Sequence, residues 1–187
     1  MSQDKPALFI DGGVVMNENV ARAAEWRRRV AEFFQPLMGG DASTWEEANR
    51  ITFARLESYL VHGPQGEQEF VQWYDTYRLR WLRGMAEFAG VACPLDDAAC
   101  LELAIKAGDY ITQRVESAFP GAADAIRVPH SAGFKLFTAS GEHWRELDGY
   151  TRAMGVRECF RASYGSDLIN QGKYSVDYYP RLFGHAA

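Results

Sequence analysis

A carboxylate, a hydroxyl and an ammonium, from Asp11, Thr138 and Lys173, each stand at or just past the end of a short apolar segment. Such a set offers fixed donors and a cation for the negative charge that develops in a group transfer. Taken singly, each residue has an ordinary explanation: a turn acid, a β-branched strand residue and a surface lysine. Because open α/β sheets bind ligands outside the carboxyl ends of their strands, the shared placement favours one ligand site.

The segments before these residues have the composition of strands in a parallel sheet. Residues 7–10 are continuously apolar, which predicts a strand buried on both faces, and Gly12 and Gly13 then let the chain turn sharply. Residues 133–138 and 159–164 repeat the pattern, and a helix is expected after each. Strands that alternate with helices form parallel βαβ units, so the expected fold class is α/β, with a Rossmann-like parallel sheet.

Between the first two strands the sequence predicts a block of helices. From residue 19 to about 108, apolar residues recur every three or four positions, and glycines and prolines divide the block into separate helices. Its aromatic residues are expected to pack the core of the block, although some could line a pocket that faces Asp11. The predicted domains are an α/β core of residues 1–16 and 109–187 and an inserted α-helical cap of residues 17–108.

Several predicted boundaries depend on single residues. A helix over about 142–154 is expected after the second strand, and residues 165–172 are expected to form a loop. A short helix that begins at Ala122 is expected to stop at Val128. The reason is that Pro129 lacks a backbone N–H and clashes with the preceding turn.

Composition excludes several classes of function. The 187 residues carry a net charge of −5, which argues against a surface for nucleic acid or anionic membranes. No apolar run approaches the roughly 20 residues of a membrane span, and the N-terminus lacks signal-peptide character. Three cysteines without CxxC spacing indicate small buried residues in a reducing compartment rather than zinc ligands. We therefore expect a soluble cytoplasmic protein.

These segments, in this order, resemble the haloacid dehalogenase-like (HAD) hydrolase superfamily. FIDGGVV at residues 9–15 is similar to its first motif, whose leading Asp is the nucleophile. KLFTASG at 135–141 is similar to the second motif, a strand that ends in Thr or Ser. Residues 165–173 match the third, in which a Lys follows a loop, and FPG at 119–121 is typical of the return from cap to core. The resemblance covers essentially the whole chain.

The resemblance implies a hydrolase that works through a covalent aspartyl intermediate. Asp11 would be the nucleophile, and Thr138 and Lys173 would complete the catalytic set. A carboxylate nucleophile splits one difficult displacement into two easier steps. The expected substrate is a small phosphorylated metabolite, with charge on its phosphoryl oxygens stabilised by these groups.

The resemblance also implies sites for the substrate and for a metal ion. Ala139, Ser140 and Gly141 would bind the substrate through backbone N–H groups at a helix N-terminus. Mg²⁺ would be held by the carboxylate of Asp11 and by the backbone carbonyl of Gly13. Such oxygen ligands suit a hard cation.

The chain departs from the superfamily pattern at Gly13. Phosphatase members carry a second Asp two residues after the nucleophile, where it acts as general acid and base. Glycine at this position can neither donate nor accept the proton, so water or another group would have to do so. Branches that cleave carbon–halogen or carbon–phosphorus bonds also lack an acid there, which leaves a dehalogenase-type reaction open.

A second departure concerns the C-terminal strands, which the sequence lacks. The superfamily's fourth motif is a pair of acids after a fourth strand, but Asp167 and Asp177 are the only acids after the third predicted strand. In the superfamily the fourth strand lies beside the first. The first strand is therefore expected at an exposed edge that could pair with a second copy in a homodimer. The alternative to a hydrolase is a truncated, non-catalytic chain that acts through association.

Overall fold

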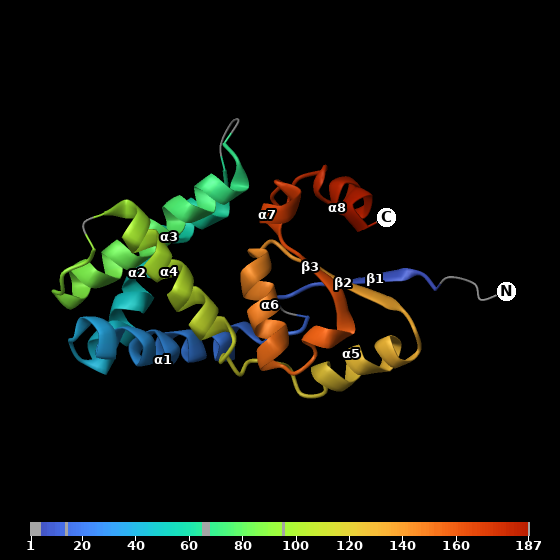
Figure 1. The fold of residues 1–187 in the computed structure, drawn as a ribbon, viewed down its shortest axis with the longest axis horizontal. Helices are drawn as coiled ribbons and strands as arrows, with labels where there is room; N and C mark the ends of the chain where they lie inside the picture. The colour runs from blue at the N-terminus through green and yellow to red at the C-terminus, as the bar shows by residue number, and fades with distance from the viewer. Residues whose placement is uncertain (1–4, 14, 65–67, 95, 187) are drawn as a thin grey trace. The chain divides into compact units, whose positions relative to one another are not determined.

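The computed structural model describes residues 5–13, 15–64, 68–94 and 96–186 (Figure 1). The chain divides into two compact units: Met1–Arg22 with Thr112–Ala187, here called the sheet unit, and Ala23–Ile111, here called the helical unit. Within the described ranges no helix is long and apolar enough to cross a bilayer.

The sheet unit is built on three parallel strands: β1 (Ala7–Ile10), β2 (Lys135–Ala139) and β3 (Phe160–Tyr164). Their order is β1-β2-β3, so β1 lies at an edge of this sheet (Figure 1). Ile10 of β1 lies level with Thr138 of β2. The parallel ladder confirms the predicted α/β class with a Rossmann-like sheet.

Apolar side chains cover both faces of the sheet. One cluster of buried residues comprises Met16, Ile126, Leu136, Val156, Cys159 and Phe160. The other comprises Ala139, Ile169, Tyr178 and Leu182. Because successive strand residues point to opposite faces, Leu8 and Ile10 pack against the first cluster and Phe9 against the second. These β1 side chains are only half-buried, as suits an edge strand, so the expectation of a fully buried first strand was wrong.

The helices of the sheet unit are α5 (Ala122–Ser131), α6 (Trp144–Ala153), α7 (Ser166–Ile169) and α8 (Tyr178–Ala186). The helix predicted over about 142–154 forms as α6, and the predicted loop 165–172 contains the short α7. α5 continues past Pro129, so the predicted stop at Val128 was wrong. Pro129 lies in the last turn of α5, where little of the hydrogen-bond ladder remains to be lost.

The helical unit contains α2 (Ala42–His62), α3 (Phe70–Ala89), α4 (Asp97–Thr112) and most of α1 (Asn19–Met38). Its core is aromatic. The rings of Phe34 and Trp45 stack with centroids 5.0 Å apart, and Trp81 meets Phe34 edge-on. The indole N–H of Trp81 donates to Asn49 Oδ1 at 2.9 Å, which satisfies a buried polar group. These aromatic residues pack the core, as the helical spacing predicted.

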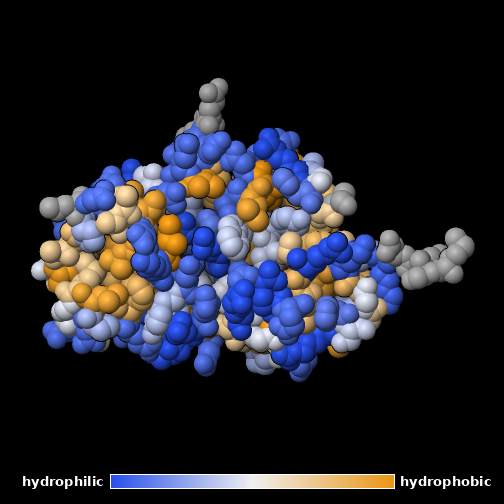
Figure 2. Space-filling view, viewed as in Figure 1, coloured by the Kyte–Doolittle hydropathy of each residue, from blue (hydrophilic) through white to orange (hydrophobic). Residues whose placement is uncertain are grey.

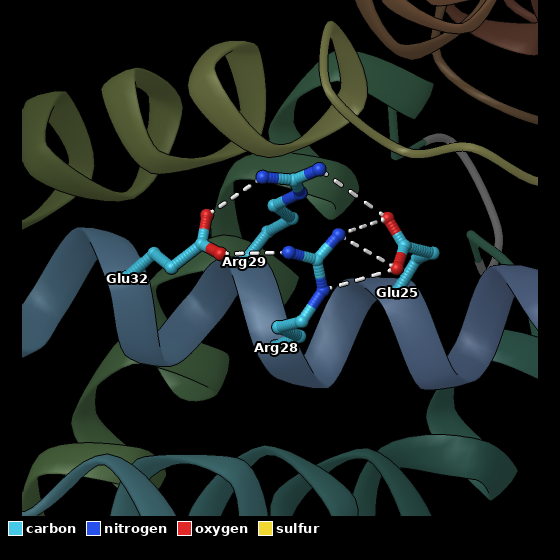
Figure 3. A network of polar contacts seen from close by, with 4 residues as sticks. All are labelled: Glu25, Arg28, Arg29 and Glu32. Carbon is cyan, nitrogen blue, oxygen red and sulfur yellow. Dashed lines mark hydrogen bonds and ion pairs between the residues drawn. The ribbon is translucent and has the colours of Figure 1, made fainter.

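Within the helical unit, α1 carries a network of ion pairs on its surface (Figure 3). Arg28 pairs with Glu25 at 2.8 Å and with Glu32 at 3.0 Å, and Arg29 pairs with Glu32 at 2.8 Å. The partners stand three or four residues apart, one helical turn, so they lie on the same face. Exposed pairs of this kind contribute about 0.3–0.5 kcal/mol each.

The surface exposes apolar side chains in separate places. On the face drawn in Figure 2, hydrophobic areas are interrupted by hydrophilic residues. Val20, Val61 and Val128 are among the large apolar residues that are mostly exposed. Scattered apolar residues are normal on protein surfaces and need no partner.

The three cysteines are free thiols. Cys100 and Cys159 are buried, as predicted, and Cys93 is half-buried. The Sγ atoms of Cys93 and Cys100 lie 3.4 Å apart as a hydrogen-bonded pair. In the described ranges no group of His, Cys, Asp and Glu side chains could hold a metal ion.

Candidate active site

Asp11 and Lys173 meet at the carboxyl end of β1, although 162 positions separate them in the chain. The Lys173 ammonium donates to Asp11 Oδ2 and forms an ion pair with it. Asp11 directly follows β1, and Lys173 lies in the segment between α7 and α8. Both side chains keep part of their surface exposed, 31% for Asp11 and 21% for Lys173. The pair is therefore accessible to a small molecule as well as fixed in place.

Thr138 and Ser140 differ in where they place their hydroxyls. Thr138 is fully buried in β2, and its hydroxyl donates to the carbonyl of Tyr164 at 3.2 Å, which ties β2 to β3. Ser140, just past the strand, lies beside the turn that follows Asp11: a methyl group at Gly12 would come within 3.1 Å of Ser140 Oγ. Of these two hydroxyls, that of Ser140 stands closer to the first motif.

The carboxylate of Glu142 also lies beside this turn. Ser140 Oγ donates to Glu142 Oε2 at 2.9 Å, and Arg22 donates to the other oxygen, Oε1. A methyl group at Gly12 would lie 2.5 Å from Glu142 Oε2 and 2.8 Å from Leu147. Only glycine leaves room at position 12 for the carboxylate as it stands. Glu142 thereby lies next to the residue that follows Asp11.

The turn after Asp11 is anchored by the buried side chain of Asn17. Its backbone N–H and its side-chain amide both donate to the carbonyl of Gly12 at 3.3 Å. Ser117 in turn donates to Asn17 Oδ1 at 3.0 Å, and the N–H of Phe119 donates to the Met16 carbonyl at 3.1 Å. Residues 117–119, which include the start of the predicted return to the core, therefore fix the turn that carries Asp11.

The loops that follow β2 and β3 are joined by a nearly buried acid. Asp167 accepts the backbone N–H of Trp144 at 2.8 Å, and its other oxygen lies 3.5 Å from His143 Nε2. A methyl group at Gly165 would meet the Glu142 carbonyl at 2.3 Å, so the two loops approach backbone to backbone. This contact holds Glu142 and the start of α6 against the chain that leads to Lys173.

Tyr178 at the start of α8 completes the surroundings. Its hydroxyl donates to the Ser140 carbonyl at 2.8 Å. Burial raises the pKa of the Tyr178 hydroxyl above its ordinary value, and three nearby acids raise it further: Asp11, Asp167 and Glu142. Tyr178 is thus a protonated donor that fixes the backbone after β2, with the three carboxylates of the site around it.

The residues present do not form a magnesium site by themselves. In the described part of the chain no three His, Cys, Asp or Glu side chains come together as ligands, and the carboxylate of Asp11 already pairs with Lys173. The two expected donors are the Asp11 carboxylate and the Gly13 carbonyl. Mg²⁺ requires near-octahedral oxygen coordination, which two donors from the protein do not define.

Sequence reasoning missed Glu142 and Arg22. Glu142 stands one residue past the second motif, and a charged residue directly after the Ser140-Gly141 turn was a signal that could have drawn notice. Arg22 gave no signal, because its place on an amphipathic helix looks like that of any surface arginine. Ala139, expected in a loop, is the last residue of β2, and α6 begins only at Trp144.

Comparisons with known proteins identify the fold. No protein-family model and no curated protein matches the chain. Among solved structures, the defluorinating L-2-haloacid dehalogenase Rha0230 aligns with a TM-score of 0.60 at 16% identity, over 97% of this chain and 68% of its own. An L-2-haloacid dehalogenase from Xanthobacter autotrophicus aligns with a TM-score of 0.54 at 17% identity, over 97% and 64%.

A third similar structure is that of YfnB from Bacillus subtilis, a HAD-type hydrolase in a form bound to magnesium. It aligns with a TM-score of 0.57 at 15% identity, over 98% of this chain and 73% of YfnB. At these identities the likeness concerns the fold. The chain has the HAD-like fold, an α/β core with a helical cap, as the resemblance of its motifs predicted.

Proposed function

We propose that the chain is a HAD-type hydrolase that acts on a small anionic molecule with Asp11 as its nucleophile. The observation that carries the proposal is the ion pair between Asp11 and Lys173 at the carboxyl end of β1. If Asp11 were only a turn residue, there would be no reason for an ion pair with a lysine 162 positions away in the chain. The HAD-like fold supports the same reading.

The chemistry follows from the charges of the pair. A carboxylate oxygen of Asp11 attacks the substrate, the bond to the leaving group breaks, and the substrate fragment stays linked to Asp11. Water then cleaves this intermediate and regenerates the carboxylate. The Lys173 ammonium aligns the nucleophile and offsets the negative charge of the substrate in the transition state.

The backbone after β2 supports substrate binding. Ala139 ends β2, the strand next to β1, and Ser140 and Gly141 follow it. Tyr178 holds this segment through the Ser140 carbonyl. Donors fixed in this way suit a phosphoryl group. We assign Thr138 a supporting part, since its hydroxyl bonds to Tyr164.

A small phosphate ester is the first substrate class, and a 2-halo acid is the second. The second is favoured by one observation: position 13 carries no acid to protonate an alkoxide leaving group. A halide leaves without a proton. Two of the similar structures are L-2-haloacid dehalogenases, which supports including this class.

Magnesium stays a prediction from the resemblance, for the phosphate class alone. Asp11 and Gly13 would be its only protein donors, so the substrate and water would have to complete its coordination before it could neutralise phosphoryl charge. If a phosphate ester is still turned over in the presence of a chelator, the reaction does not require magnesium. A halo-acid reaction is expected to be insensitive to chelators.

The experiment is a substrate screen with a matched pair of variants. Phosphate esters and 2-haloacids are offered to the wild type, to D11N and to D177N, which removes an exposed acid outside the site. We expect turnover by the wild type and D177N and none by D11N. Turnover that D11N retains contradicts the nucleophile assignment, and no turnover on any substrate favours a non-catalytic chain that acts through association.

A further inference from the structure

Gly13 carries no acidic side chain, but another acid of the sheet unit, Glu142, lies beside the same turn. A methyl group at position 13 would find no atom closer than 3.8 Å, and its nearest neighbours would be Arg22 Nη2 and, at 3.9 Å, Asn19 Oδ1. The space into which an acid at position 13 would project is therefore bordered by polar groups of α1. The guanidinium of Arg22 borders this space through Nη2 and donates to Glu142 Oε1 through Nη1.

Glu142 lies on the other side of the same turn. Its Oε2 is 2.5 Å from where a methyl group at Gly12 would stand, and Gly12 is bonded to Asp11. The carboxylate keeps 21% of its surface exposed, so water can reach it. The Glu142 carboxylate, which comes from the segment after β2, therefore lies against Gly12, the residue next to the nucleophile Asp11.

Two donors, Arg22 and Ser140, fix the orientation of this carboxylate. Arg22 donates to Oε1 of Glu142, and it also donates to Asn19 Oδ1 at 3.0 Å, which holds the guanidinium in place. Ser140 donates to Oε2 at 2.9 Å. Burial lowers the pKa of Arg22, but its ion pair with Glu142 outweighs this and leaves the pKa raised, so the guanidinium stays charged. A charged donor on one oxygen and a hydroxyl on the other orient Glu142 as a proton acceptor.

We propose that Glu142 is the general base of the hydrolytic step and that Arg22 is its positioning residue, in place of the acid absent at position 13. The inference rests on the proposed function, because it concerns the water that cleaves the Asp11-linked intermediate. Neither residue belongs to the three motifs from which the resemblance was drawn.

In a phosphoryl intermediate, water forms a bond to phosphorus as one of its protons moves to Glu142, and the bond between phosphorus and the Asp11 oxygen breaks. Asp11 regains its carboxylate, phosphate leaves, and Glu142 returns its proton to solvent. For an ester intermediate formed from a 2-halo acid, Glu142 takes a proton from water as its oxygen bonds to the carbonyl carbon of Asp11. The bond between that carbon and the ester oxygen then breaks, the 2-hydroxy acid leaves with the proton that Glu142 returns, and Asp11 regains its carboxylate.

The test separates the two chemical steps. With a substrate found in the screen, E142Q is expected to form the intermediate at the wild-type rate and to hydrolyse it about 100-fold more slowly. Intact-mass measurement after an acid quench should then find an adduct that maps to the Asp11 peptide. E32Q, which removes a carboxylate from the ion pairs of α1 outside the sheet unit, is the matched control and should accumulate no more adduct than the wild type.

A second substitution that returns an acid to the site distinguishes a chemical role of Glu142 from a structural one. G13D in the E142Q background returns an acid to a position with room for it, and it should restore hydrolysis at least tenfold and remove the adduct. R22Q should accumulate the adduct as E142Q does, and R22K should do so less. If E142Q fails to fold by circular dichroism, E142D is measured in its place, with partial hydrolysis expected.

The outcomes keep the two proposals apart. An E142Q that turns over like the wild type while D11N is inactive overturns the role of Glu142 and leaves that of Asp11 intact. An E142Q adduct that G13D does not relieve also overturns the assignment, because the defect is then not the missing base. A wild type without turnover or adduct on any substrate overturns both.

Discussion

Lys173 donates to the carboxylate of Asp11 across 162 positions of sequence, at the carboxyl end of an edge strand. This contact joins the first and third segments that the sequence singled out. It depends on the turn anchored by Asn17 and on the contact of Asp167 with the start of α6.

Removing the ammonium should impair catalysis more than stability. K173M keeps much of the aliphatic volume and is expected to lower turnover about 100-fold, in line with the loss of one charge-stabilising donor. K106M is the matched control, since Lys106 is an exposed lysine of α4 that also pairs with an acid, Glu102. Steady-state kinetics of both variants on one substrate decides. Equal effects of the two substitutions would contradict a special role for Lys173.

Gly12 is predicted to tolerate no side chain. G12A would place a methyl group 2.5 Å from Glu142 Oε2 and 2.8 Å from Leu147, so either the carboxylate or the turn must shift. We expect a loss of about 1–3 kcal/mol in the free energy of unfolding, together with reduced turnover. G184A is the control, because a methyl group there meets nothing within 4 Å on α8. Urea unfolding measures the free energy of unfolding of both variants. A G12A variant as stable as the wild type would show that the turn can accommodate a methyl group.

Asp148 should make stability depend on acid pH. Burial raises its pKa, but hydrogen bonds from Arg152 and Arg157 outweigh this and leave the pKa lowered. Such a group stabilises the fold above its unfolded pKa, about 4, and loses this contribution as pH falls through the folded value. D148N should therefore cost about 1–2 kcal/mol at pH 7 and less at pH 3.

Urea unfolding at both pH values measures this difference. D124N is the control: Asp124 is 84% exposed, and its pair with Arg127 should contribute little at either pH. A D148N effect that stays the same from pH 7 to pH 3 would contradict the assignment to the charge of Asp148.

The edge strand predicts self-association. In the described part of the sheet β1 pairs on one side only, with β2, and the backbone groups of its other side are available to a second strand. We expect light scattering to give twice the chain mass at high protein concentration. A monomer mass throughout a dilution series would count against pairing through this edge.

The sequence predicted most of the fold because its signals were local. Apolar runs that end in Asp11 and Thr138 predicted parallel strands, and the spacing of aromatic residues such as Trp45 and Trp81 predicted a packed helical block. The apolar composition of residues 7–10 did not show that β1 is half-buried, because the burial of a strand depends on which strands pair with it. Pro129 misled for a related reason: a proline stops a helix by the bonds it removes, and few remained in that turn.

Of the candidate site, the pairing of Asp11 with Lys173 was open to prediction because Asp11 follows one strand and Lys173 follows the loop after another. The place of Thr138 was not, since its hydroxyl bonds to β3 instead of facing a ligand. The contact between Arg22 and Glu142 joins positions 120 apart, and no spacing in the sequence indicates it. Contacts of this kind depend on how the turn after β1 packs against the segment after β2.

The most direct test of the central claim is the mass of the protein quenched in acid during turnover. With a phosphate ester or a 2-halo acid from the screen, the account predicts an adduct on the peptide that contains Asp11, absent from D11N and present in D177N. Wild-type turnover with an adduct on another residue, or an adduct that D11N retains, would contradict it.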